Sequence, residues 1–292
     1  MLAASSSQHV ARTRTLSAGY LAPYKICTGI SYTALVVTAI YYSFCELGGT
    51  LPDDHRSGHS QSSLFFDPNP AITLTAALFI SQAVYVASVW STKDATPLAT
   101  VGCAHFIASE LLLSGFAHLW MHDYLWLSEA LLVVNFFNLS FAYFCNSHCL
   151  RLVHFGPIVG PLVWNFTALY WMGAKAVDSS RFAAHVVANA SMWGWLGYGL
   201  FYLAAYKDYI FGIGLSMLSL STGFGQYVSG SPSAYLHKAT ALTVGGILSA
   251  TSLAVIIYDL CSQYDALDCE KAPLLHSEPH IQNKDDDTSP LE

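Results

Sequence analysis

Charged side chains are scarce in this chain. Asp, Glu, Lys and Arg make up only 11% of its 292 residues, whereas 53% of the residues are hydrophobic and 14% are aromatic. A soluble domain usually carries about 25% charged residues, and so few charges cannot cover a soluble core of this composition. The composition therefore predicts an integral membrane protein and excludes a secreted disulfide scaffold and a disordered chain.

Basic residues are few and form no stripe. The chain has 12 Lys and Arg against 19 Asp and Glu, a net charge of −7. Residues 261–292 hold eight of the acidic residues and two lysines, so the rest of the chain is nearly neutral. Because nucleic-acid binding needs a clustered basic surface, no nucleic-acid partner is expected.

The sequence also lacks strong catalytic and metal-binding motifs. It contains no His-Glu-x-x-His, no Gly-x-Ser-x-Gly and no phosphate-binding loop. Four possible zinc ligands surround one predicted turn without a strong motif spacing: Cys145, His148, Cys149 and His154. The sequence thus favours a non-enzymatic protein with no catalytic residues, no metal site and no cofactor.

Long apolar runs dominate the chain instead. A bilayer core of about 30 Å requires about 20 residues of helix. Eight runs meet this length, near residues 24–45, 71–90, 98–120, 124–145, 155–174, 183–206, 209–228 and 239–260. The predicted fold class is an all-α polytopic transmembrane bundle of about eight spans. Seven spans remain the alternative if a glycine-rich stretch, 194–199 or 212–225, does not cross fully.

The spans divide the chain into three parts: an N-terminal arm (1–23), a transmembrane domain (24–260) and an acidic disordered tail (261–292). An even number of spans places both termini on one side. Eight of the twelve Lys and Arg lie on that side, so the positive-inside rule predicts cytosolic termini. The expected location is an endomembrane (endosome, vacuole or Golgi) or the plasma membrane, with the lipid bilayer as partner. The acid-free, serine-rich arm also resembles a mitochondrial transit peptide.

Three junctions have distinctive residues. His122-Asp123 and Lys207-Asp208 are the short connections after the third and sixth spans, so each is predicted to form a tight antiparallel hairpin. Pro157 and Pro161 open the fifth span, where proline is expected to distort the helix.

Polar side chains inside the spans are the main candidates for function, because ionisable groups in a bilayer are costly and often functional. The third span carries a stripe with a spacing of four residues, which places its members on one helix face: Glu110, Ser114, His118 and His122. Such a stripe is expected to face protein or water rather than lipid.

Depth along the helices suggests partners for this stripe. Counting from the turn at His122, Glu110 lies level with Asn135, and Glu129 lies near the level of His118. The sequence therefore predicts two pairs across the hairpin, Glu110 with Asn135 and Glu129 with His118. The full candidate polar path is Glu110, Ser114, His118, Glu129, Asn135 and Asn138.

Two interpretations of these residues remain open. They line a proton or cation path, because histidine changes charge near neutral pH, or they are hydrogen-bonding contacts that hold membrane helices together. The leading function is a non-enzymatic multi-pass membrane protein of uncharacterised role, and a secondary transporter of a small solute or protons is the first alternative. The second alternative is a membrane-embedded hydrolase or lipid-modifying enzyme, which needs several side chains to converge: His105, His118, His122, Asp123 and Glu129.

The tail carries two short patterns that resemble cytosolic sorting signals. Tyr264-Asp265-Ala266-Leu267 has the tyrosine-x-x-hydrophobic form, and Glu270 precedes the pair Leu274-Leu275 by four residues. Extended peptides of this kind bind through a few side-chain pockets. Clathrin-adaptor complexes are therefore an expected partner of the tail.

Three stretches resemble a known family. They are Trp126–Leu132 with Asn135–Leu139, Gly160–Leu169 and Ala204–Tyr209. Together they are similar to the fungal multi-pass membrane proteins of domain of unknown function 1774, with the likeness extending over about residues 24–260. The resemblance implies a fungal source and a polytopic membrane fold, and it implies no activity and no catalytic residues.

Overall fold

The computed structural model describes residues 18–47, 68–91, 97–145, 155–176, 182–229 and 234–271. All regular structure in these residues is helical, so the predicted all-α class is confirmed. The eight α-helices are α1 (Ala18–Leu47), α3 (Pro68–Ser91), α4 (Pro97–Met121), α5 (Leu125–Cys145), α7 (Gly160–Ala176), α8 (Phe182–Tyr206), α9 (Tyr209–Ser229) and α10 (Ala234–Lys271). A helix lies over each of the eight predicted apolar segments.

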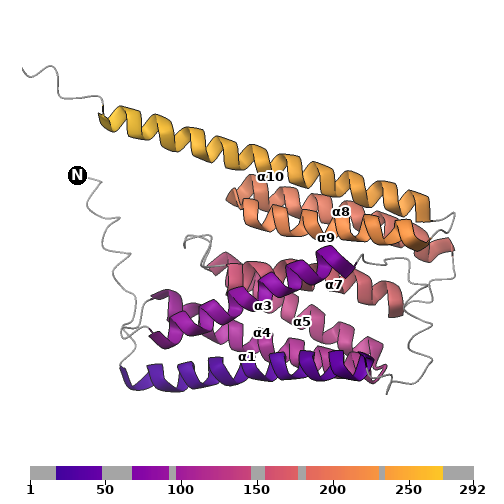
Figure 1. Ribbon diagram of the computed structural model, residues 1–292, viewed down its shortest axis with the longest axis horizontal. Helices are drawn as coiled ribbons and strands as arrows, with labels where there is room; N and C mark the ends of the chain where they lie inside the picture. Colours follow the sequence, from indigo (N-terminus) through magenta and orange to yellow (C-terminus); the bar gives the residue numbers. More distant parts are fainter. Residues whose placement is uncertain are drawn as a thin grey trace, which may run out of the picture.

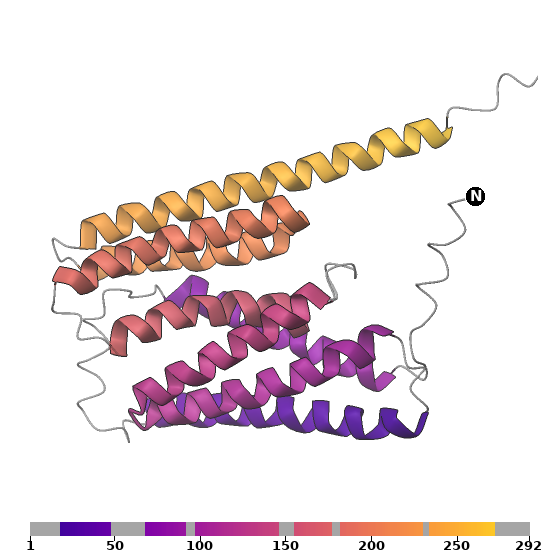
Figure 2. The ribbon, with the colours of Figure 1, turned by 180° about the vertical axis from the view of Figure 1, so that it is seen from behind.

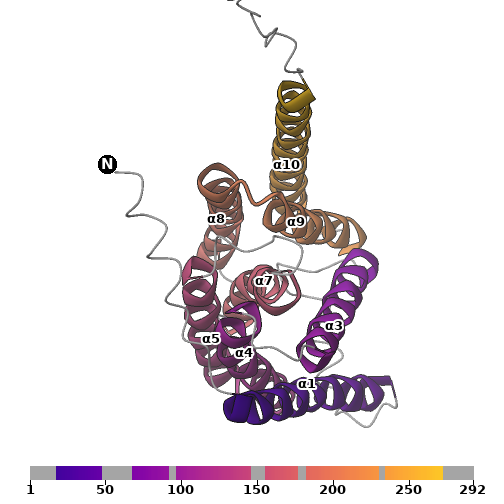
Figure 3. The ribbon, with the colours of Figure 1, turned by 90° about the vertical axis from the view of Figure 1, so that its left-hand side faces the viewer.

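The helices lie side by side along the long axis of the molecule. In Figure 1 and, from behind, in Figure 2, α8, α9 and α10 run along one side and α1 along the opposite side. Figure 3 looks down the bundle and shows α7 in the middle, between α3, α5, α8 and α9. The central helix therefore contacts most of the bundle.

Within the described residues, three helical segments are long and apolar enough to cross a membrane: Thr73–Ser91 in α3, Leu125–Cys145 in α5 and His237–Ser262 in α10. The shorter apolar segment Tyr209–Phe224 lies in α9. The number of membrane crossings remains a prediction.

The largest buried cluster joins α5, α7, α8, α9 and α10. Its fully buried members include Leu139, Leu162, Tyr202, Phe211 and Leu248. Smaller clusters join α1, α4, α5 and α7, and α3 with α4. These clusters place α7 against its neighbours and fix the positions of its polar and aromatic residues.

The fifth predicted span begins with irregular backbone. A five-residue π-helix, η1 (Phe155–Val159), precedes α7 and contains Pro157. Proline has no N–H to donate, so Pro161, the second residue of α7, cannot make the regular helix hydrogen bond to the backbone oxygen of Pro157. The segment packs closely on α3, because a Cβ atom at Gly156 would lie only 2.7 Å from the backbone oxygen of Ser81. The expected distortion of this helix therefore occurs where it meets α3.

Both predicted tight hairpins are confirmed. One residue in each turn has a positive φ angle, 62° at Asp123 and 51° at Lys207. Asp208 caps α9, because its Oδ1 accepts hydrogen bonds from the backbone N of Ile210 (3.1 Å) and Phe211 (3.2 Å). Its Oδ2 accepts a hydrogen bond from the hydroxyl of Tyr143 on α5 (2.9 Å), so one buried carboxylate joins the hairpin to the bundle.

The first and last helices extend beyond the predicted apolar spans. α1 begins at Ala18, inside the expected arm, and α10 continues to Lys271, inside the expected disordered tail. The residues after Cys261 include several good helix formers (Ala, Leu, Gln, Glu and Lys), and the first helix breaker is Pro273. With 38 residues, α10 is about 57 Å long, and Figure 1 shows it extending beyond α8 and α9.

The cap at Asp208 yields a first prediction. Asp208→Ala should lower the free energy of unfolding by about 2 to 3 kcal/mol, because the helix cap is lost and the buried Tyr143 hydroxyl loses its acceptor. Thermal or denaturant unfolding of the purified protein measures this loss. Asp208→Asn is the matched control, since asparagine still caps a helix, and it should lose clearly less. Equal losses in both variants would contradict the capping role.

Candidate functional site

Glu110 is fully buried where α4 meets α3. Its Oε1 accepts a hydrogen bond of 2.9 Å from Nε2 of Gln82, which is also buried. Two more oxygens of this pair, Oε2 of Glu110 and Oε1 of Gln82, are buried without a hydrogen-bond partner among the described residues, as is Oγ of Ser109. The site is therefore a closed polar contact with unused acceptor atoms.

The rest of the stripe on α4 faces α1. Oγ of Ser114 lies 2.9 Å from Oγ1 of Thr38, and Nδ1 of His118 lies 2.6 Å from the hydroxyl of Tyr42. His118 is exposed, and its ring also lies against that of His122 at a centroid distance of 4.6 Å. The predicted stripe is thus a real face of α4, and it binds α1 and α3.

The predicted pair of Glu110 with Asn135 is wrong. Nδ2 of Asn135 donates to Oδ1 of Asn165 on α7 (3.0 Å), and Nδ2 of Asn165 donates to the backbone oxygen of Leu132 (3.0 Å). Position along a helix axis sets the depth of a side chain but not its rotation about that axis. Asn135 is turned towards α7, whereas Glu110 is turned towards α3.

Asn138 bonds to a residue outside the predicted path. Its Oδ1 lies 2.8 Å from Nδ1 of His105, and its Nδ2 donates to the backbone oxygen of His105 (3.0 Å). This two-point contact joins α4 to α5. It also occupies His105, one of the histidines that a membrane hydrolase would need.

Glu129 lies towards α7 rather than α4. A Cβ atom at Gly173 would lie 3.7 Å from Oε1 of Glu129, and Oε2 of Glu129 is buried without a partner among the described residues. His118, its predicted partner, bonds to Tyr42 instead. The predicted pair across the hairpin does not form.

These contacts divide the predicted path among separate places between helices. No three His, Cys, Asp or Glu side chains come together as a metal site in the described part of the chain. Of the four possible zinc ligands, only Cys145 belongs to that part, and it is exposed. The structure thus supports hydrogen-bonded helix contacts more strongly than a continuous path.

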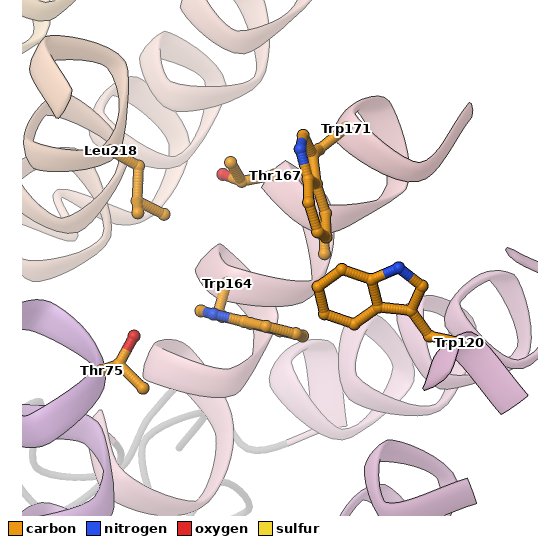
Figure 4. A pocket seen from close by; sticks show the side chains of 7 residues that line it. Thr75, Trp120, Trp164, Thr167, Trp171 and Leu218 are labelled. Carbon is orange, nitrogen blue, oxygen red and sulfur yellow. The ribbon is translucent and has the colours of Figure 1, made fainter. Parts of the chain in front are cut away.

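A pocket of about 200 Å³ lies between α3, α4, α7 and α9. Its lining is mostly apolar and aromatic: Thr75, Trp120, Trp164, Thr167, Ala168, Trp171 and Leu218. Figure 4 shows the three indole rings on one side and Thr75, Thr167 and Leu218 around the open centre. The sequence interpretation missed this pocket, although the spacing Trp164, Thr167, Ala168, Trp171 places four residues on one helix face.

Ring contacts hold the tryptophans in place. Trp120 and Trp171 meet edge to face at a centroid distance of 4.7 Å. Trp164 meets Phe116 edge to face at 6.0 Å, and Phe116 stacks on Trp120 at 5.9 Å. Such pairs are favourable geometries for aromatic rings, so the aromatic wall is preformed.

The sorting-like signals of the tail are not tested by the structure. Tyr264, Leu267 and Glu270 belong to the end of α10, where only the backbone is described, and Leu274 and Leu275 lie outside the described residues. Their role remains a prediction.

The contact between Glu110 and Gln82 yields a second prediction. In a double-mutant cycle of Glu110→Leu and Gln82→Leu, the free energies of unfolding should be non-additive by about 0.5 to 1.5 kcal/mol, because either change alone removes the same hydrogen bond. Denaturant titration of the four proteins in detergent micelles measures the coupling. Additive losses would show that the pair contributes no net interaction.

No curated protein and no solved structure matches the chain. One family model matches residues 185–275, which comprise most of α8, all of α9 and α10 and a short segment beyond. Three stretches of sequence suggested the family, and one of them, Ala204–Tyr209, lies inside this match. The predicted resemblance is therefore confirmed over residues 185–275, where the chain matches the family described as fungal protein of unknown function (DUF1774).

Proposed function

We propose that the chain is a multi-pass integral membrane protein without enzymatic activity. All eight helices cross the bilayer, both termini lie in the cytosol, and the protein resides in an endomembrane or the plasma membrane. The observation that carries this proposal is the inward pairing of polar side chains between apolar helices. Membrane helices lack a hydrophobic drive towards one another and use such hydrogen bonds to associate.

The pairing extends across the bundle. Besides the contacts of α4 and α5, it joins α9 to α10, where Oγ of Ser216 donates to the backbone oxygen of Gly245 (2.8 Å) and Oγ of Ser219 donates to that of Ala241 (2.8 Å). The hydroxyl of Tyr32 on α1 donates to the backbone oxygen of Phe79 on α3 (2.9 Å). Side-chain hydroxyl groups thus hydrogen-bond α9 to α10 and α1 to α3.

The outer faces of the helices support the same proposal. Large apolar side chains are exposed on α3, α5 and α10, including Ile80 (65%), Phe137 (66%) and Tyr258 (62%). Extensive exposed apolar surface is unusual for a soluble monomer. In a bilayer, these side chains contact lipid chains instead of water. η1 and α7 together have 22 residues and the shortest other helices have 21, so each segment exceeds about 30 Å and is long enough to span.

The proposed topology yields a third prediction. Single cysteines introduced into a cysteine-free chain at Ser5 and Ser289 should both react with a membrane-impermeant maleimide only after the membrane is permeabilised, because both termini face the cytosol. A cysteine at Ser57, between α1 and α3, should react in intact cells if the protein is in the plasma membrane. If it is in an organelle, this cysteine should react only after the organelle membrane has also been permeabilised. Opposite accessibility of Ser5 and Ser289 would mean an odd number of crossings and would contradict the proposal.

A secondary transporter of protons or a small solute is the second candidate. The observation that favours it is the buried, unpartnered Oε2 of Glu110 beside the unpartnered Oε1 of Gln82. Buried ionisable groups in membrane helices commonly mark ion pathways. The described contacts do not favour the hydrolase, because His105 bonds to Asn138 while His118 lies against His122 and bonds to Tyr42.

Proton flux tests this second candidate. A proton transporter that uses the buried carboxyls should acidify reconstituted vesicles containing a pH-sensitive dye, and Glu110→Gln or Glu129→Gln should reduce the flux at least ten-fold. The amide keeps the size of the side chain, so folding is expected to persist and is checked by gel filtration. Equal flux in the wild type, both variants and protein-free vesicles would remove this candidate.

A further inference from the structure

The pocket between α3, α4, α7 and α9 is smaller than the sites that enclose whole ligands. Its volume is about 200 Å³, whereas pockets for drug-sized ligands have roughly 300 to 1,000 Å³. A molecule bound here therefore inserts only one end. For a protein within a bilayer, as proposed above, the remainder of such a molecule stays among the lipid chains.

The pocket offers one unused hydrogen-bond donor. The indole N–H of Trp164 has no acceptor among the described residues, and in Figure 4 its nitrogen lies at the end of the ring nearer Thr75 and Leu218. Trp164 is only partly buried, so this N–H is accessible to a ligand. An indole N–H in an apolar setting usually finds a hydrogen-bond partner. An acceptor from a ligand would supply one.

The pocket also offers an acceptor. The hydroxyl of Thr167 donates to the backbone oxygen of Val163 (3.1 Å), which leaves the lone pairs of its oxygen available. One donor and one acceptor among apolar walls match a single hydroxyl group, which accepts and donates one hydrogen bond each. A charged headgroup would be buried here without a counter-charge, at high cost.

We propose that this pocket binds the hydroxyl end of a sterol. A sterol has an apolar body with one terminal hydroxyl, and the flat ring that carries the hydroxyl can lie against an indole of the aromatic wall. Its rigid ring system also loses little conformational entropy on binding, unlike a flexible fatty alcohol. This inference rests on the proposed membrane location, but not on the number of crossings.

Energy transfer to a fluorescent sterol tests the proposal. The full chain is reconstituted in phosphatidylcholine vesicles with increasing dehydroergosterol, which accepts excitation energy from tryptophan. Trp90, Trp126 and Trp193 are first replaced by Phe, because they are more than half exposed and would transfer energy to any sterol in the bilayer. The remaining tryptophans are in the pocket or, like Trp195, buried. We expect transfer that saturates with sterol concentration.

Two pocket variants and a matched control make the test specific. Thr167→Leu fills the pocket and should weaken apparent sterol affinity at least ten-fold. Thr33→Leu makes the same change on the exposed face of α1, where the threonine also donates only to its own helix, and should leave affinity unchanged. Trp164→Phe keeps an aromatic ring without the donor and should weaken affinity about five-fold, as expected for one hydrogen bond.

Several outcomes would overturn the proposal. Transfer that rises linearly with sterol concentration, or equal affinity in Thr167→Leu and Thr33→Leu, would show that the pocket is not the site. Stronger quenching of the same tryptophans by dibrominated acyl chains than by sterol would identify a phospholipid chain as the occupant. Gel filtration and unfolding temperature confirm that each variant is folded, so a loss of affinity reports on the pocket. Protein recovered only outside the vesicles would contradict the proposed membrane location rather than the ligand class.

Discussion

Hydrogen bonds between side chains of neighbouring helices are the interaction on which the rest of the structure depends. In a bilayer, where we propose that this protein resides, apolar helix surfaces pack against lipid as readily as against one another, so they specify neither partner nor rotation. A buried polar group, in contrast, strongly disfavours arrangements that leave it unpaired. The contacts of Gln82 with Glu110, His105 with Asn138 and Asn135 with Asn165 therefore fix how α3, α4, α5 and α7 face each other.

The central helix α7 combines this role with a contribution to the tryptophan pocket. Asn165 faces α5 and closes the polar contact with Asn135, while Trp164 and Trp171 contribute to the pocket. The π-helix η1 lets the chain approach α3 closely at Gly156. The same helix thus contacts α3 and α5 and lines the apolar pocket between α3, α4, α7 and α9.

The C-terminal helices form the part that matches a family, and one residue links them to the rest. Asp208 caps α9 and accepts the hydrogen bond of Tyr143 from α5. Around it, Tyr202 stacks on Phe211 at a centroid distance of 4.0 Å and meets Tyr143 edge to face at 4.7 Å. The turn at Asp208 therefore lies within an aromatic cluster that joins α5, α8 and α9.

The sequence by itself determined where the helices and tight turns lie, because the length of an apolar run and the brevity of a polar connection are local properties. It also identified the polar face of α4, because helical periodicity groups Glu110, Ser114 and His118 whatever surrounds them. Only the tertiary structure decided which helix that face meets, and it paired Glu110 with Gln82 rather than Asn135. The tryptophan pocket was decided there too. Rotation about a helix axis depends on the packing of all neighbours at once, and no local pattern contains it.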